Sequence, residues 1–266
     1  PAPFSEKELK DAIFGSYSEG APGPDGLSFL FLQEFWEVIK QDVMALFDDF
    51  HAGKLGIYRL NFAVITLIPK EEDATDMKKF RPISLLNCIS KVFTKVLTNR
   101  LATLMNFLTS SNQSTFIKGR FILESVVTAH EVLHSTYHSD NSHLVLKLDY
   151  EKAFDKVNLD FLMEILQKRN FGPVWTKWIY QITHMGSVGV KVNGVDSDLV
   201  VTNKGLRQGD PISPLLLNIV VDVLTRMLIK AASHNLIKGL CSDLIPGGVI
   251  CLQYADDTIR IMDKDE

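Results

Sequence analysis

Residues 247–262 read GGVICLQYADDTIRIM, and the centre of this stretch decides the fold. The residues Tyr254–Asp257 (YADD) lie between two short apolar runs, which predicts a β-hairpin with two adjacent carboxylates at its tip. Aspartate is a poor strand former, and neighbouring negative charges repel each other. The pair therefore forms either a polar turn or part of a cation site, and the rest of the chain has to distinguish the two.

The composition indicates a chain that can bury a large core. Its 266 residues are 46% hydrophobic, and this length allows one large domain or two smaller ones. The longest apolar stretch, residues 215–224, is too short and too polar to span a membrane, and no signal peptide is recognisable at the start. Three cysteines without metal-ligand spacing fit a reducing compartment. We therefore expect neither a membrane protein nor a secreted one.

Charge is distributed unevenly, although the net charge is only −4. Residues 51–120 carry eleven basic and four acidic side chains, whereas residues 1–50 carry ten acidic and three basic ones. A basic segment of this kind suits a surface that faces a polyanion. Ordinary solvated helix faces would give the same counts equally well.

The residue pattern predicts an α+β fold with sheets covered by buried helices. Ser5 to Glu8 form a capping box that starts a short acidic helix. Further helices are expected over residues 28–50, 88–107, 123–137, 159–170, 173–185 and 212–232. Strands are expected over residues 62–69, 81–86 and 143–149, in a hairpin over 188–201 that turns on Asn193-Gly194, and on both sides of YADD.

Asp149 ends the strand over 143–149, just as Asp256 and Asp257 follow an apolar strand. If these strands are neighbours, three carboxylates meet at one edge, and Mg²⁺ is a cation that prefers such oxygen ligands. Two such ions, about 4 Å apart, can activate a hydroxyl and stabilise a leaving oxygen in phosphoryl transfer. Any single aspartate is more often a cap or turn residue, so only the combination favours a metal site.

Seven blocks of sequence together resemble the reverse transcriptase domain of LINE-type non-LTR retrotransposons, particularly the lineage abundant in plant genomes. The blocks occur in the family's order: GPDG (23–26), ITLIPK (65–70), FRPISLLNCISKVFTKVLTNRL (80–101), FIKGRFILESVVTAHEVLH (116–134), LKLDYEKAFDKV (146–157), GLRQGDPISPLLLNIVVDVL (205–224) and LQYADD (252–257). The resemblance implies a right-hand polymerase fold, with fingers over about 1–140, a palm over about 141–266 with some interleaving, and an antiparallel palm sheet packed on helices.

The same resemblance implies an RNA-directed DNA polymerase. It would add deoxynucleotides to a primer 3′-hydroxyl by two-metal phosphoryl transfer, as part of retrotransposition. The expected cofactors are two Mg²⁺ ions, with Mn²⁺ as a substitute. The expected partners are an RNA template, a DNA primer or target site and deoxynucleoside triphosphates. Such a protein works in a nuclear or cytoplasmic ribonucleoprotein.

Roles carry over to the residues that match the family's motifs. Asp149, Asp256 and Asp257 correspond to the metal-binding catalytic aspartates. Phe154 corresponds to the aromatic gate that excludes a 2′-hydroxyl; the alternative, a Phe in the core, is less favoured because of the match to the block. The remaining matches are Lys70 and Arg81 for the triphosphate, Gln208 for nucleotide and template, and Lys118, Gly119, Arg120 and Gly209 for the template and primer. For Lys70 and Arg81 the alternative is an ordinary basic surface residue.

Three features depart from the family pattern. Lys204 stands where arginine is common, Arg260 stands where a large apolar residue is usual, and the chain stops nine residues after Asp257. The thumb and an upstream endonuclease are then missing, so a fragment or a decayed copy is expected, and residues 1–266 alone are predicted not to extend primers. The alternatives are a catalytically silent RNA-binding remnant and a maturase-like splicing factor, which would need a basic extension.

Overall fold

The computed structural model of the protein describes every residue except 139–142, 193–194, 243–244, 246 and 265–266. The chain forms two compact units. The first consists of Pro1–Arg100 and Phe154–Ser213, and the second of Leu101–Ala153 and Pro214–Glu266. Each unit thus combines two separate segments of the sequence. The chain passes from one unit to the other within three helices, α4 (Cys88–Ala102), α7 (Ala153–Lys156) and α10 (Ser213–Ser233).

The helices of the first unit follow the predicted order. Besides its part of α4, it contains α1 (Glu6–Phe14), α2 (Phe29–Glu34), α3 (Trp36–His51), α8 (Leu159–Lys168), α9 (Pro173–His184) and the short 3₁₀ helices η1 (Ile57–Arg59) and η2 (Met77–Lys79). The predicted capping box of Ser5 and Glu8 is present at the start of α1. The single helix predicted over 28–50 is wrong, because Phe35 ends α2 and starts α3 with non-helical backbone angles. The apolar periodicity runs across this break and does not reveal it.

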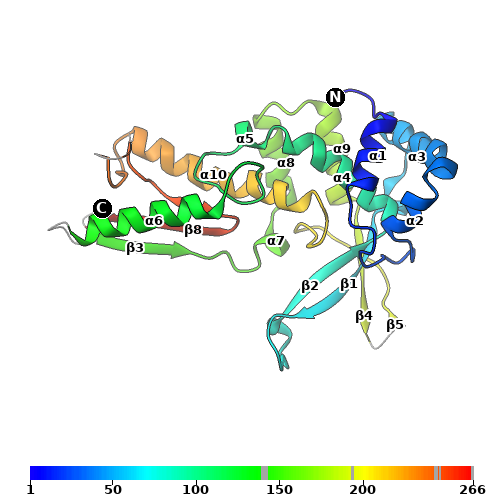
Figure 1. Cartoon of the computed structure of the whole chain (residues 1–266), viewed down its shortest axis with the longest axis horizontal. Helices are drawn as coiled ribbons and strands as arrows, with labels where there is room; N and C mark the ends of the chain where they lie inside the picture. Colours follow the sequence, from blue (N-terminus) through cyan, green and yellow to red (C-terminus); the bar gives the residue numbers. More distant parts are fainter. Residues whose placement is uncertain (139–142, 193–194, 243–244, 246, 265–266) are drawn as a thin grey trace. The chain divides into compact units, whose positions relative to one another are not determined.

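The first unit also contains a five-stranded sheet. Its strands are β1 (Phe62–Pro69), β2 (Phe80–Leu86), β4 (Ser187–Val192), β5 (Val195–Asp196) and β6 (Val200–Val201), in the order β2-β1-β4-β5 with β6 also paired to β4. The strands β1 and β2 form a long antiparallel hairpin (Figure 1). The predicted strand over 62–69 and the extended segment over 81–86 are confirmed. The predicted turn at Asn193-Gly194 lies outside the described residues, whereas β4 does pair with β5.

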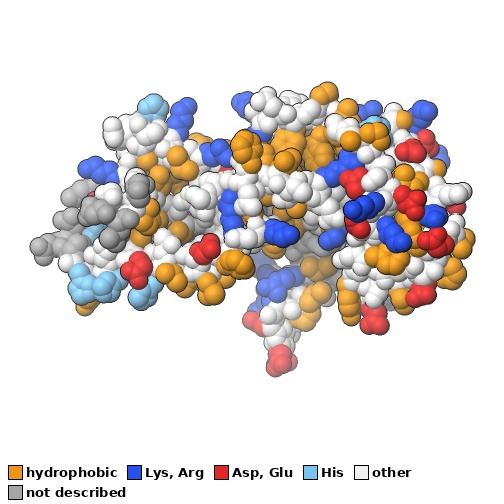
Figure 2. Space-filling view, turned by 45° about the horizontal axis from the view of Figure 1, so that its top comes forward, with side chains coloured by type: hydrophobic (Ala, Val, Ile, Leu, Met, Phe, Trp, Pro, Cys, Tyr) orange, Lys and Arg blue, Asp and Glu red, His pale blue; other side chains and the backbone are white. Residues whose placement is uncertain are grey.

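A cluster of aromatic rings fills the core of the first unit. Phe47 of α3 stacks on Phe93 of α4 with ring centroids 4.0 Å apart, and Trp178 of α9 lies 4.9 Å from Phe4 and 5.7 Å from Phe50. Large rings bury much apolar area, so truncating one of them to alanine typically costs about 3–5 kcal/mol. This cluster joins the N-terminal segment to α3, α4 and α9. Figure 2 shows that acidic side chains are frequent over α1 to α3, in agreement with the acidic composition of residues 1–50.

The second unit has a three-stranded sheet in the order β3-β8-β7. Its strands are β3 (His143–Leu148), β7 (Leu252–Tyr254) and β8 (Asp257–Asp263), and its helices are α5 (Met105–Leu108), α6 (Ile122–Tyr137) and most of α10. The helix α6 runs along β3 and β8 (Figure 1), and its Val132 packs with Leu240 and with Ile261 of β8. The predicted helix over 88–107 ends earlier, at Ala102, and α5 follows as a separate short helix.

The long helix α10 is buried over its first part, as its nearly continuous apolar sequence predicted, whereas its last turns are exposed at Arg226, Met227 and Lys230. Leu216 and Ile219 are completely inaccessible to solvent, and so are the polar residues Asn218 and Asp222. Across the described part of the chain, no helix is both long enough and apolar enough to cross a membrane.

Candidate active site

The two aspartates of YADD occupy the hairpin between β7 and β8. Tyr254 pairs with Asp257, so Ala255 and Asp256 form the turn between the strands. The predicted hairpin with carboxylates at its tip is therefore confirmed. Ala255 adopts a left-handed backbone conformation with φ of 51°, which is unfavourable for a residue with a side chain. Interactions outside the hairpin have to stabilise this turn.

Strand register brings the third aspartate to the same end of the sheet. The strands β3 and β8 are antiparallel, with Leu148 opposite Thr258. Asp149 follows Leu148 directly, and continuing the same register places it opposite Asp257. Asp149 is exposed, whereas Asp256 and Asp257 are half-buried. The neighbouring strands that the sequence argument required are thus present within one unit.

Gln113, a residue that the sequence argument did not single out, holds the turn in place. Its side-chain oxygen accepts a hydrogen bond from the backbone nitrogen of Ala255 at 3.0 Å, and its side-chain nitrogen donates to the carbonyl of Ala255 at 3.2 Å. The same oxygen accepts from the backbone nitrogen of Thr115 at 3.1 Å. Gln113 is fully buried. These bonds satisfy both backbone groups of the strained residue and offset its cost.

A second buried glutamine, Gln253, connects the hairpin to α10. The side-chain oxygen of Gln253, in β7, accepts from the hydroxyl of Thr225 on α10 at 2.9 Å. Its side-chain nitrogen lies 3.4 Å from the carbonyl of Val221, also on α10, and 3.4 Å from the hydroxyl of Thr258. Buried polar networks of this kind fix one arrangement when their members are satisfied, because any other arrangement leaves donors or acceptors unpaired.

The loop that carries Gln113 is itself anchored to α10. The amide of Asn218 donates to the carbonyl of Thr115 at 2.6 Å, and a carboxylate oxygen of Asp222 accepts from the backbone nitrogen of Ser110 at 2.7 Å. These are the two polar residues that interrupt the apolar stretch 215–224. Polar residues within a buried apolar stretch were therefore the sequence signal that another segment bonds to α10 here.

Arg120, predicted to contact the template, is used within the protein itself. Its guanidinium donates to the backbone carbonyls of Ser110, Gln113 and Asn106, and to the side chain of Asn106. Burial lowers its pKa somewhat. Arg120 therefore stabilises the loop that carries Gln113, by bonding several of its backbone carbonyls. By contrast, Lys118 and Gly119 are exposed, and Gly119 has a φ of 84°, with open space where a side chain would begin.

Two basic residues, Lys147 and Arg260, lie on the strands of the same sheet. The ammonium of Lys147 on β3 is 3.2 Å from a carboxylate oxygen of Asp257, a diagonal cross-strand ion pair. Arg260 on β8 is buried, and its guanidinium donates to the carbonyl of Ile250 at 3.5 Å. Hence Arg260 lies inside, where the family pattern has an apolar residue, and part of its hydrogen-bonding capacity is satisfied there.

The three aspartates suit Mg²⁺ by donor type, because this ion prefers carboxylate oxygens. Among the residues that the structure describes, however, no three acidic, histidine or cysteine side chains are grouped so that they could hold a metal ion. The register of the strands fits a metal centre, whereas the present side-chain orientations do not form one. Asp257 instead has the ammonium of Lys147 as its cationic neighbour.

The residues predicted to contact the nucleotide belong to the first unit. Lys70 follows β1 and its ammonium donates to the carbonyl of Lys78 at 3.1 Å, while Arg81, on β2, is exposed and pairs in register with Ile68. Both residues thus lie toward the same end of the β1–β2 hairpin. Another member of the basic segment, Lys79, forms an ion pair with Glu71 at 2.6 Å.

Gln208 is connected to α7, the short helix that contains Phe154, by a hydrogen bond to Asp155. The side-chain nitrogen of Gln208 donates to a carboxylate oxygen of Asp155 at 3.2 Å. The backbone carbonyl of Gln208 accepts from the backbone nitrogen of Ser84 on β2 at 2.7 Å. Phe154 is half-buried and does not belong to the buried core. Gly209 has a φ of 100°, and a side chain there would come within 2.9 Å of the carbonyl of Ser84. Its glycine is therefore required by packing against the protein's own β2.

Comparison with known proteins identifies the class to which this arrangement belongs. Residues 68–266, more than half of the chain, match the family described as reverse transcriptase (RNA-dependent DNA polymerase). The chain therefore belongs to the reverse transcriptase family, and the predicted resemblance is confirmed at that level.

Two relatives show the extent of the similarity. The chain is 30% identical over 260 residues to the transposon TX1 uncharacterized 149 kDa protein of Xenopus laevis, which covers 97% of this chain and 19% of that protein. It is 24% identical over 269 residues to a retrovirus-related Pol polyprotein from type-1 retrotransposable element R2 of Popillia japonica, covering 99% and 35%. The chain thus spans well under half the length of these relatives.

Solved structures show the same fold. The apo telomerase of Candida tropicalis, truncated from its C-terminal domain, superimposes with a TM-score of 0.55 at 17% identity, covering 78% of this chain and 45% of that one. The telomerase of the same organism in complex with a fragment of telomeric RNA gives a TM-score of 0.53 at 13% identity, covering 90% and 45%. The expected right-hand polymerase fold is confirmed.

Proposed function

We propose that the protein is the fingers and palm of an RNA-directed DNA polymerase from a LINE-type non-LTR retrotransposon of the plant-type lineage. It adds deoxynucleotides to a primer 3′-hydroxyl along an RNA template. The observation that carries this proposal is the register of β3 and β8, which sets Asp149 at the same sheet end as Asp256 and Asp257. The buried bonds of Gln113 to the turn support it, because catalysis by positioning needs a rigid frame.

In this proposal Asp149, Asp256 and Asp257 hold two Mg²⁺ ions, or Mn²⁺ in their place. When bound, such ions lower the pKa of an attacking hydroxyl and stabilise the charge on a leaving phosphate oxygen. To hold such ions, Asp257 would have to exchange its ion pair with Lys147 for the metal, and Asp149 and Asp256 would supply the other carboxylates. Asp149 is exposed, so its reorientation disturbs no packing.

The residues of the first unit bind and select the nucleotide. Arg81 and Lys70 contact the triphosphate, since arginine grips phosphate in a bidentate manner and lysine acts as a point charge. Phe154 excludes the 2′-hydroxyl of a ribonucleotide, and its position outside the buried core leaves its ring available. Gln208 positions the nucleotide against the template, held by its bonds to Asp155 and β2. The working assembly is a nuclear or cytoplasmic ribonucleoprotein.

Primer extension on an RNA template tests this proposal. The chain is expressed with whatever sequence its gene encodes after residue 266, and extension is measured with Mg²⁺ or Mn²⁺. Asp256→Asn, which is nearly isosteric, is expected to abolish extension, whereas Asp48→Asn, at an exposed position of the first unit, leaves it unchanged. Binding of Mn²⁺, followed by electron paramagnetic resonance, should weaken in Asp256→Asn alone. Extension at the parent rate by Asp256→Asn would refute the metal role.

A second candidate function is a catalytically silent nucleic-acid-binding module. It is favoured by the ion pair between Lys147 and Asp257 and by the lack of a ready metal group among the described residues. This candidate predicts that the parent binds RNA normally but neither binds Mn²⁺ through Asp256 nor extends a primer. The experiment above therefore separates the two functions.

A further inference from the structure

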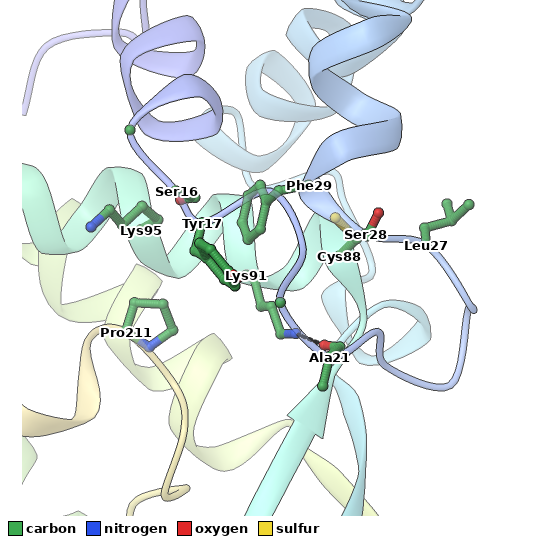
Figure 3. A pocket seen from close by; sticks show the side chains of 12 residues that line it. Ser16, Tyr17, Ala21, Leu27, Ser28, Phe29, Cys88, Lys91, Lys95 and Pro211 are labelled. Carbon is green, nitrogen blue, oxygen red and sulfur yellow. Dashed lines mark hydrogen bonds between the residues drawn. The ribbon is translucent and has the colours of Figure 1, made fainter.

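The first unit contains a pocket of about 290 Å³ that none of the residues assigned above lines. Its walls come from the segment between α1 and α2, from the first turns of α4, and from Pro211 (Figure 3). This volume lies at the lower limit of small-molecule pockets, about 300 Å³, so the pocket suits a ligand no larger than one nucleotide.

Two lysines one helical turn apart give the pocket its charge. Lys91 and Lys95 both lie on α4, and both are half-buried. The ammonium of Lys91 donates to the carbonyl of Ala21 at 2.9 Å (Figure 3), which leaves two of its three N–H groups for a ligand. Lys95 makes no hydrogen bond or ion pair within the described part of the chain. No acidic residue lines the pocket.

The carboxylate of Asp25, which interacts electrostatically with Lys91, is already hydrogen-bonded elsewhere. One oxygen of Asp25 accepts from the backbone nitrogen of Cys88 at 2.6 Å, and the other accepts from that of Leu27 at 3.2 Å. Asp25 thereby satisfies the backbone N–H of Cys88, the first residue of α4. Burial lowers the pKa of Lys91, so its charge lacks full compensation within the protein. Half-buried cations without a bonded counter-charge favour binding of an anion.

Aromatic rings form another part of the wall. Tyr17 and Phe29 both line the pocket, and Tyr17 is 73% exposed, so its ring face is free for a ligand (Figure 3). Aromatic side chains next to basic ones are the combination by which proteins bind single-stranded nucleic acids, because bases stack on rings while phosphates contact cations. Cys88 also lines the pocket, but burial raises its pKa to about 12, which keeps the thiol neutral and unreactive.

We infer that this pocket binds one nucleotide of a single-stranded polynucleotide. Its phosphate contacts the ammonium groups of Lys91 and Lys95, and its base stacks on Tyr17 and Phe29. All lining residues belong to the first unit, whereas the three aspartates belong to the second. The inference therefore concerns binding, and it can hold whether or not the polymerase proposal does.

Fluorescence anisotropy with a labelled short oligouridylate, titrated at several salt concentrations, tests this inference on the full chain. Lys95→Gln is expected to reduce the log–log salt slope by about 0.7, the value for one phosphate contact on a single strand. Tyr17→Ala is expected to weaken binding about 5- to 100-fold and to leave the slope unchanged, because stacking releases no counterions. Lys54→Gln is the matched control, since Lys54 is an exposed lysine of the same unit outside the pocket.

The outcomes separate the possibilities. If Lys95→Gln and Tyr17→Ala bind like Lys54→Gln, or if the parent does not bind the oligonucleotide, the inference is wrong. If free uridine triphosphate displaces the oligonucleotide at equal concentration of nucleotide units, the pocket binds mononucleotides and the polynucleotide assignment fails. Thermal melting of each variant verifies that it is folded. The binding measurement uses neither a primer nor a divalent metal ion, so failure of the polymerase proposal is recognised independently.

Discussion

Replacing Gln113 by leucine should loosen the hairpin that carries Asp256 and Asp257. The leucine side chain is similar in size and apolar, but it can neither accept from nor donate to Ala255. The backbone nitrogens of Ala255 and Thr115 then lose their acceptor in a region closed to water, since Gln113 is fully buried and both neighbours are also buried.

The structure sets the size of this effect. Each buried donor without a partner costs about 1–3 kcal/mol, so the two together cost about 2–6 kcal/mol. The left-handed Ala255 also loses the bonds that offset its own strain, which is of order 1 kcal/mol. Since about 1.4 kcal/mol corresponds to a tenfold change in an equilibrium constant, local opening of the hairpin should become about 30-fold more frequent or more.

Hydrogen exchange and tryptophan fluorescence together distinguish local opening of the hairpin from loss of stability in the first unit. Amide exchange in β7 and β8 reports on opening of the second unit, and it should accelerate by the stated factor. All three tryptophans belong to the first unit, so urea unfolding followed by their fluorescence should remain unchanged. Gln167→Leu, at an exposed glutamine of α8, controls for the added apolar surface. Unchanged exchange in β7 and β8 of Gln113→Leu would show that Gln113 does not hold the turn.

Three further predictions follow from single contacts. Phe154→Val should raise the ratio of ribo- to deoxynucleotide incorporation in single-turnover extension, and an unchanged ratio in an active variant would refute the gate role. Lys147→Met should tighten Mn²⁺ binding a few-fold in electron paramagnetic resonance titrations, because the ammonium 3.2 Å from Asp257 no longer competes; weaker binding would contradict this. Bonds from Arg100 hold the pKa of Glu8 below its usual 4.5, so Glu8 contributes stability above that pH which disappears as the pH falls through the lowered pKa. Urea unfolding across this range should show a flatter acid dependence in Glu8→Gln, and an unchanged profile would exclude the contribution.

Local sequence was sufficient wherever the deciding interactions are short in range. The capping box of Ser5 and Glu8, the strand over 62–69 and the hairpin at YADD each depend on residues a few positions apart. Propensity and periodicity describe such interactions directly. Helix breaks were harder to predict: the end of α2 at Phe35 and the end of α4 at Ala102 lie within apolar patterns that continue across them.

Some site residues could be identified from the sequence, whereas the contacts of others became known only from the structure. The sequence named Asp149, Asp256 and Asp257, since carboxylates at strand ends are visible in the chain itself, and the register of β3 with β8 agrees with that choice. It also assigned Arg120 to the template, which stays a prediction, and the structure adds that its guanidinium donates to the carbonyls of Ser110 and Gln113. A basic side chain looks the same in the sequence whether it contacts phosphate or backbone, so its partner decides its role.

The sequence by itself determined which groups are available: a hairpin with two carboxylates, a third carboxylate after another strand, and seven blocks that resemble reverse transcriptases. Only the tertiary structure decided what holds those groups in position. Gln113 bonds Ala255 across 142 residues, and Asn218 bonds Thr115 across 103. Pairs so distant are formed only when the whole unit has folded, because hydrogen-bond geometry requires donor and acceptor within about 3 Å, and no local pattern encodes that meeting.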